Sequence, residues 1–168
     1  MSLSSRMPEL SAFEVFLAVA KAGSLGAWQP WDRSGCSGSI YREQWMSTSR
    51  NLGSIEGAKI APLAKIVERN QVWSRMAAKY GVDNPVPPWK TSLDGICDAL
   101  DKSACGPEIL SFVDRRNEED ILAATVYSDL PYPENRLVAL AHSLVARGVI
   151  GEAELAERLA AVRARLQA

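Results

Sequence analysis

The feature that most restricts the fold is a pair of amphipathic segments at the end of the chain, residues 134–148 and 152–166. Apolar side chains recur at helical spacing along one face of each segment: Leu137, Ala141, Leu144 and Val145 in the first, and Leu155, Leu159, Val162 and Leu166 in the second. Gly148 ends the first segment, and the connection to the second is short. Helices joined so closely pack in opposite directions, so the sequence predicts an antiparallel helix hairpin.

Helical spacing also occurs earlier, over residues 9–22, 61–79, 93–100 and 108–124. In the last of these segments the apolar side chains are supplied by Phe112, Val113, Ile121 and Leu122, with Ile109 before them. A stretch rich in glycine, serine and tryptophan, residues 23–39, has neither period and is typical of a loop. No convincing alternating strand of five or more residues occurs, so the predicted fold class is all-α.

A proline cluster divides the chain. Pro85, Pro87 and Pro88 fall within four residues, where they impose extended geometry and interrupt any helix. We expect residues 1–88 to form an irregular, extended N-terminal arm with helices and tryptophan-rich loops, which wraps around a partner. Residues 89–168 are expected to form a compact helical domain that ends in the hairpin.

Composition excludes several classes of function. The 168 residues carry 19 Lys and Arg against 20 Asp and Glu, so the chain has no general attraction to nucleic acid or to anionic lipid. No run approaches the roughly 18 apolar residues of a membrane span. Cys36, Cys97 and Cys105 form no close pair, which argues against a disulfide framework and against a metal site within the chain. We expect a cytoplasmic protein.

Few residues are suited to catalysis within this chain alone. His142 is the only histidine, and on the flank of an apolar face it is far more often a partly exposed or packed side chain than a general base. The adjacent Arg115 and Arg116 point about 100° apart on a helix, so one can reach inward while the other faces solvent. The simplest interpretation of this charged run, residues 114–120, is a solvated face with ion pairs at helical spacing.

The order of elements over residues 112–166 carries a more specific signal. The parts are Arg115-Arg116 on a helix, the connectors Thr125-Val126-Tyr127 and Leu130-Pro131-Tyr132, a helix that ends in Arg147-Gly148-Val149-Ile150, and a last helix with Glu154-Leu155. This order resembles the helical N-terminal half of nitrile hydratase β subunits and the small helical β subunit of thiocyanate hydrolase.

The resemblance implies a metal-free β-type subunit of a heteromeric nitrile hydratase-like enzyme, which hydrates a nitrile to an amide. In that family Co(III) or Fe(III) is held by a cysteine-rich segment of an α-type subunit, and two of its cysteines are oxidised. By position, Arg115 and Arg116 would donate hydrogen bonds to those oxidised cysteines, and Tyr127 and Tyr132 would contact the substrate. The implied partners are the metal-bearing α-type subunit and a separate β-barrel subunit, because neither part occurs in this sequence.

The sequence departs from the family's pattern at three positions, and these departures leave alternatives open. Pro133, Arg136 and Gly151 stand where the family usually has a tyrosine, a tryptophan and a threonine or serine. One alternative is a thiocyanate hydrolase β-type subunit, and another is a non-catalytic activator or assembly protein for the metal-bearing subunit. A stand-alone helical interaction domain is the third.

Overall fold

A computed structural model of the chain describes residues 55–103 and 110–167. These residues form six α-helices and no strand: α4 (Ala61–Arg69), α5 (Trp73–Tyr80), α6 (Lys90–Ser103), α7 (Phe112–Ala124), α8 (Glu134–Ala146) and α9 (Glu152–Gln167). The all-α prediction is therefore confirmed for this part of the chain. The helix expected over residues 9–22 and the loop expected over residues 23–39 lie outside the described residues.

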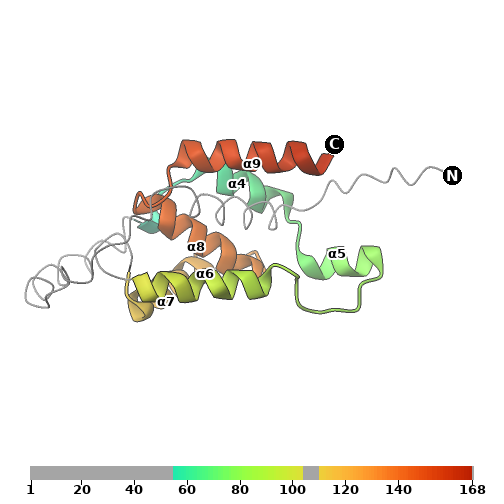
Figure 1. The fold of residues 1–168 in the computed structure, drawn as a ribbon, viewed down its shortest axis with the longest axis horizontal. Helices are drawn as coiled ribbons and strands as arrows, with labels where there is room; N and C mark the ends of the chain where they lie inside the picture. Colours follow the sequence, from blue (N-terminus) through green and yellow to red (C-terminus); the bar gives the residue numbers. More distant parts are fainter. Residues whose placement is uncertain (1–54, 104–109, 168) are drawn as a thin grey trace, which may run out of the picture.

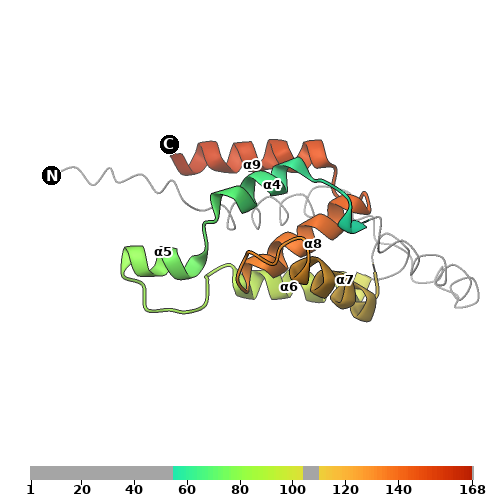
Figure 2. The ribbon, with the colours of Figure 1, turned by 180° about the vertical axis from the view of Figure 1, so that it is seen from behind.

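The helices are arranged in two layers with α8 between them (Figures 1 and 2). α4 and α9 lie side by side in one layer, and α6 and α7 lie in the other. α8 runs obliquely between the layers and makes its most extensive helix contact with α7. α5 projects from one end and returns to α6 through the proline cluster. The charged helix α7 is thus held mainly by α8 and its neighbour α6.

The hydrophobic core combines residues from both sides of the proline cluster. Ile60, Leu63 and Ile66 precede that cluster and belong to the same buried group as Leu137 and Leu155. The core therefore extends across the expected boundary at residue 88, whereas residues 1–54, the larger part of the expected arm, lie outside the described residues.

The closing helices form the predicted hairpin, but its two helices diverge. α8 leads into the turn and α9 leads back from it at an angle to α8 (Figure 1). α9 then packs along α4 rather than along α8. Gly148 occupies the turn with a positive φ of 72°, a conformation that favours glycine. No helix in the described ranges has an apolar stretch long enough to cross a bilayer.

The segment over residues 61–79 contains two helices where one was predicted. Asn70 ends α4 in the left-handed region with φ of 47°, which asparagine tolerates better than most residues. α5 then begins at Trp73, whose backbone N–H donates to Glu134 Oε1 at 2.5 Å. Glu134 is 61 residues away in sequence, so the start of α5 has no local signal, whereas Asn70 is a local signal for the end of α4.

Candidate functional site

The first turn of α7 departs from the expectation from its apolar pattern, whereas Leu122 of that pattern is buried as expected. The inward face of α7 buries Arg115, Glu118 and Glu119, together with Leu122. Phe112 and Val113, which were expected to supply its apolar face, are 57% and 59% exposed. Ser111 caps the start of the helix by accepting from the Asp114 backbone N–H. The expectation of a solvated charged face on this helix was therefore wrong for Arg115, Glu118 and Glu119.

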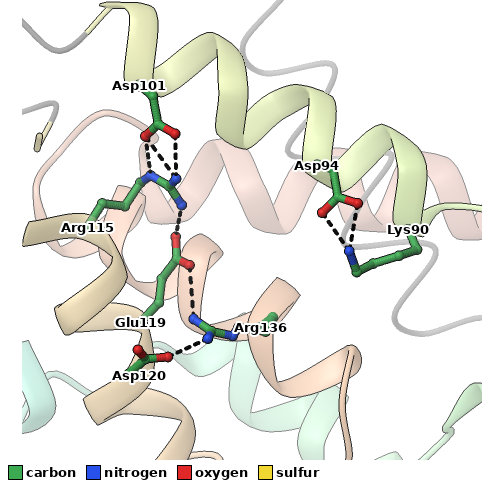
Figure 3. Close-up of polar contacts among 7 residues, drawn as sticks. All are labelled: Lys90, Asp94, Asp101, Arg115, Glu119, Asp120 and Arg136. Carbon is green, nitrogen blue, oxygen red and sulfur yellow. Dashed lines mark hydrogen bonds and ion pairs between the residues drawn. The ribbon is translucent and has the colours of Figure 1, made fainter. Parts of the chain in front are cut away.

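Arg115 is held between two helices by two carboxylates (Figure 3). Its Nε and Nη2 donate to Asp101 of α6 at 3.0 and 2.8 Å, and its Nη1 donates to Glu119 at 2.5 Å. Arg115 is only 4% exposed. Burial opposes its charge, but Glu119 and Asp101 more than offset this effect and raise the pKa of Arg115. The guanidinium is thus committed to contacts within the chain.

The ion pairs continue from α7 to α8. The second carboxylate oxygen of Glu119 lies 3.5 Å from Arg136 Nη1, and Arg136 Nη2 pairs with Asp120 (Figure 3). Burial raises the pKa of Glu119 even though Arg115 and Arg136 act in the opposite direction. A separate pair joins Glu118 to Arg147 beyond the end of α8. Ion pairs with the buried Arg115, Glu118 and Glu119 therefore link α7 to α6, to α8 and to the end of α8.

Arg116 differs from its neighbour. It is partly buried, and it makes no ion pair or hydrogen bond with any residue that the structure describes. The carboxylates of α7 are all engaged, because Asp114 accepts a hydrogen bond from Ser111 Oγ and Glu118, Glu119 and Asp120 pair with arginines. As the 100° separation predicted, Arg115 reaches inward and Arg116 remains on the outer side.

Tyr127 belongs to a buried hydrogen-bond chain rather than to a surface. Its hydroxyl lies 2.7 Å from Nδ1 of His142, and Nε2 of His142 lies 2.8 Å from the backbone oxygen of Ile55. Because a carbonyl oxygen only accepts, Nε2 carries the proton, and Nδ1 accepts from the Tyr127 hydroxyl. Burial lowers the pKa of His142 and raises the pKa of Tyr127, so both groups are neutral. The interpretation of His142 as a packed histidine is confirmed.

Tyr132 lies apart from the other predicted site residues. It is 65% exposed, and its ring centre is 5.6 Å from the ammonium of Lys90. Lys90 also binds Asp94 and stands at the start of α6, whereas Asp101, which holds Arg115, stands near the end of that helix (Figure 3). Eleven helical residues span about 16 Å, so Arg115 and Tyr132 lie toward opposite ends of α6.

The described ranges contain no group of three or more His, Cys, Asp or Glu side chains placed to hold a metal ion. Cys97 is partly buried, and burial raises the pKa of its thiol to about 11, so it is protonated at neutral pH. Cys36 and Cys105 lie outside the described residues. In the part of the chain that the structure describes, α7 contributes three buried charged side chains, Arg115, Glu118 and Glu119.

Comparisons with profiles of protein families, with curated proteins and with solved structures gave no match. The geometry of α7 and the resemblance carried by residues 112–166 are therefore the two features that bear on the function of this chain.

Proposed function

We propose that this chain is the metal-free, helical β-type subunit of a heteromeric nitrile hydratase-like enzyme. The partner would be an α-type subunit that holds Co(III) or Fe(III), and a separate β-barrel subunit would complete the complex. The complex would be located in the cytoplasm. The substrate class is a small nitrile, or thiocyanate in the related enzyme. The chain is not catalytic by itself. One observation carries the proposal: Arg116 of α7 forms no ion pair or hydrogen bond with a described residue, although its charge acts on Glu119.

The chemistry of Arg116 suits the proposed contact. A planar guanidinium donates paired hydrogen bonds to anionic oxygens, and such bonds become stronger when an interface excludes water. In the proposed complex Arg116 donates to the oxidised cysteines of the α-type subunit. Arg115 has a different role from the one its position in the family suggests: held by Asp101 and Glu119, it fixes α7 against α6 and so positions Arg116.

The two tyrosines divide in the same way. Tyr132 is exposed and supports a role at the interface or near the substrate. Tyr127 is buried and bonded to His142, which supports a role in positioning α7 and α8 rather than in contact with substrate. Of the four residues singled out by the resemblance, Arg116 and Tyr132 are thus the ones available to a partner.

A second candidate is a non-catalytic activator or assembly protein for the same metal-bearing subunit. It is favoured by the observation that Arg115 and Tyr127 are both engaged in contacts within the chain. The two candidates differ in stoichiometry, because an activator leaves the finished enzyme and a subunit remains in it.

The test is purification of the tagged chain from its native host, with metal analysis and mass spectrometry of the bound proteins. We expect a stoichiometric cysteine-rich subunit that carries cobalt or iron, and turnover of a nitrile or of thiocyanate. Arg116→Ala should reduce turnover at least about tenfold, the loss of a charge-assisted hydrogen bond worth about 1.4 kcal/mol or more. Arg165→Ala, on the exposed side of α9, is the matched control. Recovery of the chain alone, or equal turnover in both variants, would contradict the proposal.

A further inference from the structure

We draw no further inference here: the strongest candidate, the buried hydrogen-bond chain in which His142 of α8 joins Tyr127 to the backbone oxygen of Ile55, carries nothing because a pH-sensitive switch at this cluster rests on the lowered pKa of His142 alone.

Discussion

Replacement of Arg115 by alanine removes the central member of the buried ion pairs and should destabilise the fold. Arg115 donates to Asp101 and to Glu119, and these two carboxylates lose different amounts of support. Asp101 is partly exposed, so water replaces much of its lost partner. Glu119 is only 2% exposed and would keep Arg136 at 3.5 Å as its remaining cation. The main loss therefore arises at Glu119.

The size of the loss follows from this geometry. Breaking a buried ion pair by removing one partner destabilises a protein by about 3–5 kcal/mol, because the other charge stays buried. Arg136 compensates in part, so we expect a decrease near the lower end, about 3 kcal/mol, in the free energy of unfolding. The free energy of unfolding of a whole domain is roughly 5–15 kcal/mol, so this loss is a large share of it. Arg116→Ala should change the free energy of unfolding by less than about 0.5 kcal/mol.

The assay is urea denaturation followed by circular dichroism, with the free energy of unfolding extrapolated to water. The double variant Arg115→Met with Glu119→Leu removes both charges at once, and it should be more stable than Arg115→Ala because no buried carboxylate remains unpaired. A loss of less than about 1 kcal/mol in Arg115→Ala, or the same loss in Arg116→Ala, would refute the assignment of Arg115 as the buried link between α6 and α7.

Three further predictions concern α8. Tyr127→Phe leaves Nδ1 of His142 without a donor and should lower the free energy of unfolding by about 1–3 kcal/mol in urea. Burial lowers the pKa of His142, so below about pH 6.5 the unfolded chain binds a proton that the folded chain does not. The free energy of unfolding should therefore decrease as the pH falls from about 6.5 toward the lowered pKa. His142→Phe should flatten this part of the pH profile. Glu134→Ala removes the acceptor of the Trp73 N–H and should speed hydrogen exchange in the first turn of α5 about tenfold, as expected for loss of a helix cap, with no change in α9.

Much of the helical architecture could be predicted because periodicity and end signals are local. The proline and glycine residues at the ends of α8, and its apolar face, indicate this helix without any knowledge of its neighbours. The start of α5 could not be predicted in the same way. It depends on a hydrogen bond from Trp73 to Glu134, a residue of another helix, whereas Asn70 is a local signal for the end of α4.

The candidate site was only partly accessible from sequence. The spacing of Arg115 and Glu119 indicates an ion pair on one helix, but not that the pair is buried. Burial is decided by Asp101 on α6 and Arg136 on α8, which become partners only when three helices meet. Tyr127 shows the same limit, because a tyrosine in a connector carries no signal that its hydroxyl meets His142 in the interior.

The exposure of Phe112 and Val113 follows from a comparison of the two faces that the first turn of α7 could bury. Burying Phe112 and Val113 would gain about 1.5–3 kcal/mol for each side chain. It would also set apolar side chains against Asp101, Arg136 and Arg147 and deprive these ions of Arg115, Glu119 and Glu118. Asp101, Arg136 and Arg147 would each lose an oppositely charged partner, and a partly buried ion recovers only part of that loss from water. The charged residues of α6 and α8 therefore determine which face of α7 points inward, and by the same step they leave Phe112 and Val113 beside Arg116 on the outside.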